Sequence, residues 1–133
     1  MSQFVLKADT EREALEWGSL AWVTHPPLTS NKDLTVIDVE LLPGKGHAFH
    51  RHPDQEETIY VIDGRVEQWI DQDMKLLQSG DVAYIDAGIV HASFNAGDQP
   101  AKLLAILGPC VGEAGYETEE VADQEPWSSL RQA

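Results

Sequence analysis

The sequence predicts an all-β protein with a single domain. Its 133 residues are enough for one ordinary domain with its own core. Apolar and polar residues alternate in short runs, as in strands with one buried face. These runs lie at residues 34–42, 57–63, 65–70, 81–86, 90–95 and 101–107. Turn-forming residues separate them, so we expect an antiparallel barrel or sandwich with a core at about residues 33–108.

The N-terminal part, residues 1–32, is expected to be a packing or interface extension of this barrel. The segment Thr10-Glu11-Arg12-Glu13 has the form of a helical capping box, and Gly18 would end the helix. It predicts one short helix. The first twenty residues contain no basic start followed by an apolar run, so we expect neither a secretory signal nor a transmembrane helix, and a cytoplasmic protein.

Within the barrel, Asp63-Gly64 lies directly between two strand-like runs and predicts a tight hairpin that fixes their register. From Gly108 onward the pattern becomes irregular and acidic residues gather between positions 117 and 125. We expect this C-terminal tail, residues 109–133, to wrap the barrel or a partner subunit, with the acidic group facing solvent.

Charge and cysteine content exclude several classes of function. The chain has 9 Lys plus Arg against 23 Asp plus Glu, a formal net charge of -14. Such a chain repels a phosphate backbone and an anionic membrane, so we expect no nucleic-acid or membrane partner. Cys110 is the only cysteine, which excludes an intramolecular disulfide and a thiol-rich zinc site. We interpret it as an inert, small apolar residue.

Histidines and one glutamate form the candidate site. His50 and His52 are one residue apart before a strand-like run, and successive strand side chains alternate, so the two imidazoles point the same way. Glu57 heads an otherwise apolar strand face, where an unpaired carboxylate would be costly and a cation would be one partner. His91 begins another strand and could supply a third imidazole. The competing interpretation is that these are ordinary polar or core histidines and a solvated strand-end carboxylate.

The remaining histidines are set aside. His47 has the parity of Phe49 and Arg51, opposite to that of His50, and is therefore expected on the outer face or rim. His25 precedes Pro26-Pro27, a rigid extended stretch, and is expected at a surface or interface.

Two motifs make the chain resemble the cupin family. The spacing of Gly44, His50, His52, Glu57 and Gly64 resembles the first cupin motif at every defining position. The second motif is matched by Gly80, Gly88, His91 and Asn95, with Asp86 where the family has proline. The resemblance implies a double-stranded β-helix, the jelly-roll barrel of cupins, with His50, His52, Glu57 and His91 as metal ligands. The Asp86 departure affects the turn and leaves the ligand positions intact.

This ligand set has chemical consequences. Three neutral imidazoles and one carboxylate leave a divalent ion with one net positive charge and, in octahedral geometry, two open positions. The set suits Fe, Mn, Ni or Co at least as well as Zn, and the sequence does not choose among them. Glu57, when not bound to metal, could act as a general base. Gln68 lies on the face that the family register turns inward, as a substrate contact or a satisfied core amide.

The resemblance suggests dioxygenase-type chemistry on a small organic molecule first. A non-oxidative metal-dependent isomerase or lyase is the second hypothesis, and a non-catalytic small-molecule binding module is the third. Because cupins often associate through their sheets, we expect a homodimer. Trp69 and Trp127 are expected to be packing or dimer-interface residues.

Overall fold

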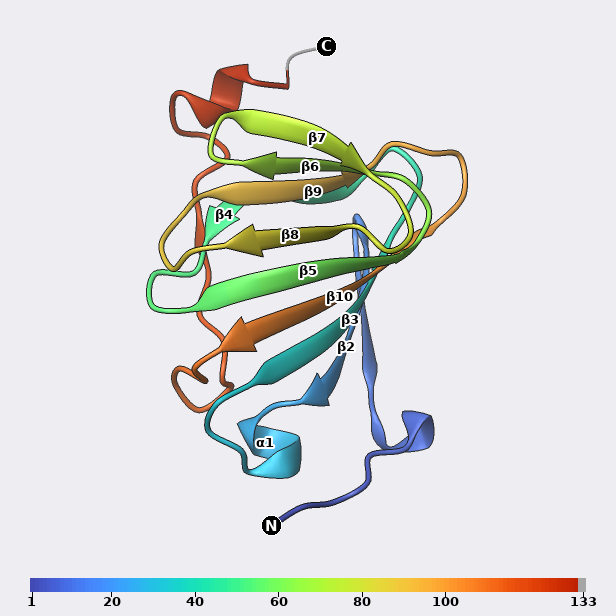
Figure 1. Ribbon diagram of the computed structural model, residues 1–133, viewed down its shortest axis with the longest axis vertical. Coiled ribbons are helices and arrows are strands. Elements are labelled where there is room, and N and C mark those ends of the chain that lie inside the picture. Colours follow the sequence, from blue (N-terminus) through green and yellow to red (C-terminus); the bar gives the residue numbers. More distant parts are fainter. Residues whose placement is uncertain (132–133) are drawn as a thin grey trace.

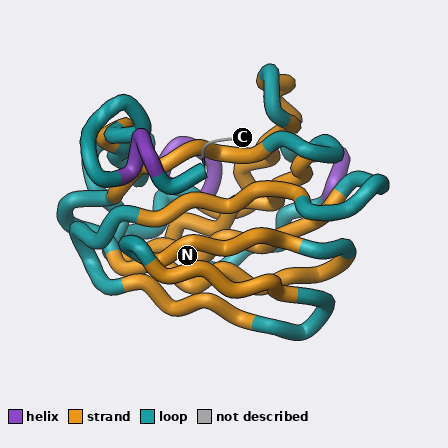
Figure 2. The backbone as a smooth tube through the Cα atoms, turned by 90° about the horizontal axis from the view of Figure 1, so that it is seen from above, coloured by secondary structure: helices purple, strands orange, loops and turns teal. Residues whose placement is uncertain are grey.

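The computed structural model describes residues 1–131 and confirms the all-β double-stranded β-helix (Figure 1). The strands form two antiparallel sheets. Figure 2 shows neighbouring strands running side by side, with the loops gathered at the two ends of the barrel. The six-stranded sheet has the order β1 (Arg12–Leu15), β2 (Gly18–Thr24), β3 (Thr35–Leu41), β10 (Ala101–Gly108), β5 (Glu56–Asp63) and β8 (Val82–Ile85). The five-stranded sheet has the order β11 (Glu119–Glu120), β4 (Gly46–Arg51), β9 (His91–Asn95), β6 (Val66–Ile70) and β7 (Asp73–Leu77).

Helical structure in residues 1–131 is limited to α1 (Pro26–Thr29) and the 3-10 turns η1 (Lys7–Asp9) and η2 (Trp127–Ser129). The helix expected from the capping-box pattern is wrong, because that segment forms the β1–β2 hairpin. A side chain at Gly18 would collide with the carbonyl oxygen of Glu40, so β2 approaches β3 very closely there. Sheet pairing overrides the local helical preference. None of the helices described is long and apolar enough to span a membrane.

The expected hairpin at Asp63-Gly64 is also wrong, although the turn exists. Strand β5 belongs to the six-stranded sheet and β6 to the five-stranded one, so the chain crosses between sheets at this point. Gly64 has a φ of +95°, and a Cβ there would lie 2.9 Å from the Cα of Ala101. The hairpin in this part of the chain joins β6 to β7, a strand that the sequence pattern did not reveal.

The main core lies between the two sheets. Alternate residues of β3, β5 and β10 point inward and pack with residues of β6 and β8. Burial of each large aliphatic side chain contributes about 1.5–3 kcal/mol. The buried members are Ile37, Val39, Leu41, Ile59, Val61, Val66, Ala83, Ile85, Ala101, Leu103, Ala105 and Leu107.

A second apolar cluster lies on the outer face of the five-stranded sheet. The C-terminal segment, residues 115–131, crosses this side of the molecule and ends above β6 and β7 (Figure 1, red). We call it the C-terminal strap. Its apolar side chains cover strands β4 and β9, so both faces of this sheet are packed. The cluster contains Phe49, Val90, Ala92, Phe94 and Val121, with Trp69, Trp127 and Leu130 packed against it.

Candidate metal centre

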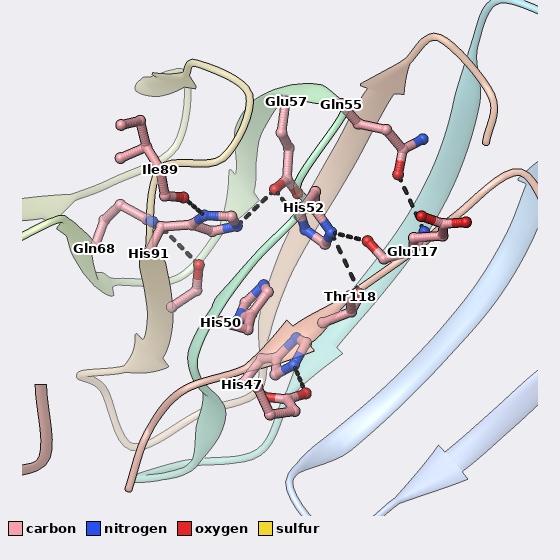
Figure 3. A network of polar contacts seen from close by, with 12 residues as sticks. His47, His50, His52, Gln55, Glu57, Gln68, Ile89, His91, Glu117 and Thr118 are labelled. Atoms are coloured by element: carbon pink, nitrogen blue, oxygen red, sulfur yellow. Dashed lines mark hydrogen bonds and ion pairs between the residues drawn. The ribbon is translucent and has the colours of Figure 1, made fainter. Parts of the chain in front are cut away.

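Four side chains from separate strand regions converge inside the barrel (Figure 3). His50 lies near the end of β4, and His52 follows that strand. His91 is the first residue of β9, and Glu57 lies on β5. Each side chain is buried, and one nitrogen or oxygen atom of each lies within 4.8 Å of the others. The sequence pattern named these four residues, and the fold brings them together as a cluster that could bind a metal ion.

Sheet pairing explains the convergence. In the β4–β9 register, His50 lies directly opposite His91, so their side chains share one face. Glu57 comes from the facing sheet, on the same side of β5 as the core residues Ile59 and Val61. The centre therefore lies between the two sheets.

Backbone carbonyls orient all three rings of the cluster. The Nδ1 atoms of His50, His52 and His91 lie 2.6, 2.8 and 3.0 Å from the carbonyl oxygens of Ala48, Glu117 and Ile89. A carbonyl only accepts hydrogen bonds, so each Nδ1 donates. The neutral rings then direct the Nε2 lone pair toward the centre, as metal-ligating histidines do.

With all three rings neutral, the atoms that face the centre are all acceptors. Glu57 Oε1 lies 2.7 Å from His91 Nε2 and 3.2 Å from His52 Nε2. Glu57 Oε1 and His91 Nε2 are both buried and neither makes a hydrogen bond of acceptable geometry. Unpaired buried acceptors are costly. One divalent cation would satisfy these atoms together, and the nitrogen and oxygen donor set fits such an ion.

Electrostatics in the cluster favour a charged carboxylate. Burial alone would raise the pKa of Glu57, but the contacts with His52 and His91 outweigh it and hold that pKa well below its usual range. Burial, reinforced by His47 and the other histidines, lowers the pKa of His50. Burial opposes protonation of His91, yet its contact with Glu57 raises the pKa. In the metal-free protein a proton on His91 can therefore balance the Glu57 charge, and a metal must displace it.

A narrow cavity of about 40 Å³ adjoins the cluster. That volume has room for about three water molecules. Half of its lining side chains are aliphatic, and the rest are aromatic rings, histidines and other polar groups. The lining residues are Trp17, Leu20, Ile37, Val39, Leu41, His47, His50, Glu57, Ile59, His91, Ser93, Leu103, Ala105 and Tyr116.

His47 lines this cavity and its side chain is still 22% exposed, so of its two expected places the outer face is wrong and the rim agrees with the structure. An irregularity in the β4–β9 register between His47 and His50 puts three steps of β4 against two of β9. This bulge turns His47 and His50 to the same face. Their rings stack with centroids 3.6 Å apart, and Trp17 stacks on His47 at 5.2 Å. His47 Nε2 also lies 2.9 Å from Glu120 Oε1.

Gln68 is buried, and its amide is occupied by hydrogen bonds. Its Oε1 accepts from Ser93 Oγ at 2.6 Å, and its Nε2 donates to the carbonyl oxygen of Trp69 at 3.1 Å. It lines a separate groove with Lys75 and Tyr84 and does not line the cavity at the cluster.

Two other residues considered in the sequence lie outside the cluster. His25 stacks on Trp22, and Cys110 is half-buried beside Thr35 and Asn31. Gln55 and Tyr116, both close to His52 in space, were not predicted from the sequence. Gln55 was hidden because its partners are backbone groups, and Tyr116 because it lies in the irregular tail.

Comparison with known proteins identifies relatives of the whole barrel. A family described as "Cupin domain" matches residues 37–107. Quercetin 2,3-dioxygenase of Bacillus subtilis (strain 168) is 36% identical over 111 residues, covering 71% of this chain and 33% of that protein. The putative germin-like protein 9-2 of Oryza sativa subsp. japonica is 31% identical over 87 residues, with 62% and 41% covered. The chain thus spans about a third to two fifths of these relatives.

A solved structure of an uncharacterised conserved protein with a double-stranded beta-helix domain, from Klebsiella pneumoniae subsp. pneumoniae MGH 78578, is similar over nearly the whole chain. The TM-score is 0.69 at 26% identity, covering 90% of this chain and 99% of the other.

Proposed function

Because the chain belongs to the cupin family, we propose that it is a metal-dependent enzyme that acts on a small organic molecule by dioxygenase-type chemistry. The observation that carries the metal part is the buried pair Glu57 Oε1 and His91 Nε2, which lie 2.7 Å apart, make no hydrogen bond of acceptable geometry and would both be satisfied by one bound cation. The similarity to a quercetin dioxygenase supports the reaction type.

We propose His50, His52, Glu57 and His91 as the ligands. A bound divalent transition metal would supply Lewis-acid and redox chemistry, and this donor set leaves coordination positions for other molecules. Other groups of the chain would exclude water and move a proton. The aliphatic side chains of the cavity keep bulk water away from the centre. Glu57 is placed to accept a proton from a substrate hydroxyl when it is not itself a ligand.

Tyr116 is a second candidate for handling a proton. Its ring lies 5.0 Å from that of His52, and it lines the cavity. Burial raises the pKa of the Tyr116 phenol, so it stays protonated at neutral pH and can donate a hydrogen bond to a substrate oxygen. A Tyr116→Phe variant should keep its metal and lose substrate affinity.

Oxygen uptake tests the reaction type. Protein loaded with Fe(II) under anaerobic conditions is mixed with candidate enediols, flavonols or diketones, and dioxygen consumption is then followed. We expect uptake with a compound of this panel that disappears in His50→Ala. Turnover without dioxygen would identify a non-oxidative isomerase or lyase instead, and binding without turnover would identify a binding module.

We also propose a homodimer. The outer face of the six-stranded sheet exposes Tyr60, Ile62, Val82 and Tyr84, which are 43–52% accessible. Apolar side chains gathered on a sheet face are a common feature of subunit interfaces. Light scattering on the purified protein should give twice the monomer mass, and a monomer across the micromolar range would contradict the proposal.

A further inference from the structure

The C-terminal strap reaches the candidate metal centre as well as covering a sheet. We infer that residues 115–120 of the strap, held in place by Gln55, position the metal site: Gln55 fixes the backbone at Glu117, and the Glu117 carbonyl orients His52. This inference rests on the proposed metal site. Gln55 is a positioning residue in this account, because it acts through the strap.

The buried side-chain amide of Gln55 makes hydrogen bonds to the backbone of the strap and of the segment just before it. Its Nε2 donates to the carbonyl oxygens of Pro109 and Gly115 at 2.8 and 2.9 Å. Its Oε1 accepts from the backbone N–H of Glu117 at 3.2 Å. The side chain is 2% exposed, so water does not replace these bonds. One side chain therefore bridges three backbone groups of residues 109–117.

The Gly115 carbonyl has a second buried partner. Thr35 Oγ1, on a fully buried residue of β3, donates to it at 2.6 Å. Gly115 has a φ of +79°, and a Cβ there would lie 2.7 Å from Thr35 Oγ1 and collide with the ring of Pro26. Only glycine fits at this position of the backbone. Residue 115 is therefore fixed relative to β3, and the strap cannot slide along the barrel.

From this fixed point the strap contacts His52 directly (Figure 3). The Glu117 carbonyl oxygen lies 2.8 Å from His52 Nδ1, and Thr118 Oγ1 lies 3.3 Å from the same nitrogen. The opposite ring nitrogen, Nε2, is the one near Glu57. The hydrogen bond from the Glu117 N–H to Gln55 and the one from His52 Nδ1 to the Glu117 carbonyl therefore link Gln55 to the His52 ring, whose other nitrogen, Nε2, faces the centre. Such outer partners set the orientation and basicity of a ligating histidine.

The strap also contacts the strand that carries His50. Strand β11 pairs with β4 so that Glu119 lies opposite Arg51 and Glu120 opposite His50. The Glu120 carboxylate lies 2.9 Å from His47 Nε2, and the His47 ring is stacked on His50. The strap therefore supports two of the four candidate ligands from outside, in addition to covering the sheet.

The competing explanation is that the strap only stabilises the fold. Its far end packs Val121, Trp127 and Leu130 on the outer face of the five-stranded sheet, which would stabilise the protein without affecting metal geometry. The two explanations differ in one respect. A stabilising role predicts lost stability alone, whereas a positioning role predicts a change in metal affinity and in the spectrum of the bound ion.

Titration of Co(II) into the metal-free full-length protein distinguishes them, because Co(II) absorption bands report ligand geometry. Gln55→Met keeps the side-chain volume and removes both the amide donors and the acceptor. Val61→Ala is the control, since Val61 is fully buried and lies outside the cavity. We expect Gln55→Met to bind Co(II) about tenfold more weakly with shifted bands. Val61→Ala should lower the melting temperature and leave affinity and bands unchanged.

Equal affinity and identical bands in wild type and Gln55→Met would overturn the inference. If Gln55→Met does not fold, Thr118→Val removes a polar contact to His52 with little change in shape and should shift the Co(II) bands; unchanged bands would count equally against it. Absence of Co(II) binding in the wild type would instead contradict the proposed metal function, so the two failures are distinguishable.

Discussion

The outer faces of the two sheets differ sharply. On the five-stranded sheet, the C-terminal strap covers Phe49, Ala92 and Phe94, and Arg131 stacks over the Phe94 ring at 3.6 Å. On the six-stranded sheet, Tyr60, Val82 and Tyr84 remain about half exposed. One sheet is packed on both sides by its own chain, and the other only on its inner side.

This difference follows the placement of the candidate ligands. The five-stranded sheet carries His50 and His91, with His52 just beyond β4, whereas the six-stranded sheet contributes Glu57 and most of the aliphatic core. A metal site requires ligands that are held rigidly by a supporting shell. The second packed layer therefore lies behind the sheet that carries the three candidate histidine ligands, and the exposed outer face belongs to the other sheet.

The largest expected effect comes from removing a ligand on the five-stranded sheet. His91→Ala should purify with less than about a tenth of the wild-type metal content, because an imidazole ligand is lost from a buried centre. His25→Ala is the matched control, since His25 stacks on Trp22 outside the cluster and should keep its full metal content. Elemental analysis of protein purified without added metal measures both. Wild-type metal content in His91→Ala would mean that the five-stranded sheet does not carry this metal ligand.

The second effect tests the cover of the five-stranded sheet. Trp127 packs in the outer cluster and is half-buried, so Trp127→Ala should cost about 2 kcal/mol of unfolding free energy, less than a fully buried tryptophan. Calorimetry should show a melting temperature roughly 6 °C lower. An unchanged melting temperature would mean that the strap does not stabilise this face.

A pH effect tests the contact between the two sheets at the centre. The pKa of His91 is raised in the fold through Glu57, so this contact stabilises the metal-free protein fully below about pH 6.5. The contribution is lost as the pH rises through the folded pKa. Denaturation of metal-free wild type and His91→Gln over a pH series should give a stability difference that shrinks with increasing pH. A stability difference that does not change with pH would show that the contact with Glu57 does not raise the pKa of His91.

The smallest effect on stability is expected at the open face. Tyr84 is 52% exposed, and its hydroxyl donates a hydrogen bond to Asp86 at 3.1 Å. Tyr84→Ser should change the unfolding free energy of the monomer by less than about 0.5 kcal/mol. Paired with Tyr60→Ser, it should weaken the proposed dimer, which light scattering across a dilution series measures. A loss of 2 kcal/mol in the monomer would mean that the two faces are not as different as the exposures indicate.

Local sequence patterns predicted those features of this protein that depend on local geometry. Strand alternation put His50 and His52 on one side, and the motif spacing added Glu57 and His91; the bulge in β4 lies before His50 and therefore does not disturb this set. The same parity argument failed at His47, since a bulge in β4 reverses the parity. A side chain at Gly46 would collide with the carbonyl oxygen of Ser93, but a close approach of this kind is visible only once the strands are paired.

Features that depend on distant partners could not be predicted. The helix expected before Gly18 became a hairpin because β2 pairs with β3, and the turn at Gly64 joins two sheets because each strand finds its partners elsewhere. The support from Gln55 and Glu117 was hidden for another reason. A backbone carbonyl is present at every residue, so its use as a partner of His52 leaves no mark in the sequence.

The most direct test of the account is a crystal structure of the metal-loaded protein with diffraction data collected at the absorption edge of the bound metal. The account predicts one anomalous peak about 2.0–2.3 Å from Nε2 of His50, His52 and His91 and from the Glu57 carboxylate. It also predicts that His52 Nδ1 remains bonded to the Glu117 carbonyl. A peak between His47 and Glu120, or no peak inside the barrel, would contradict it.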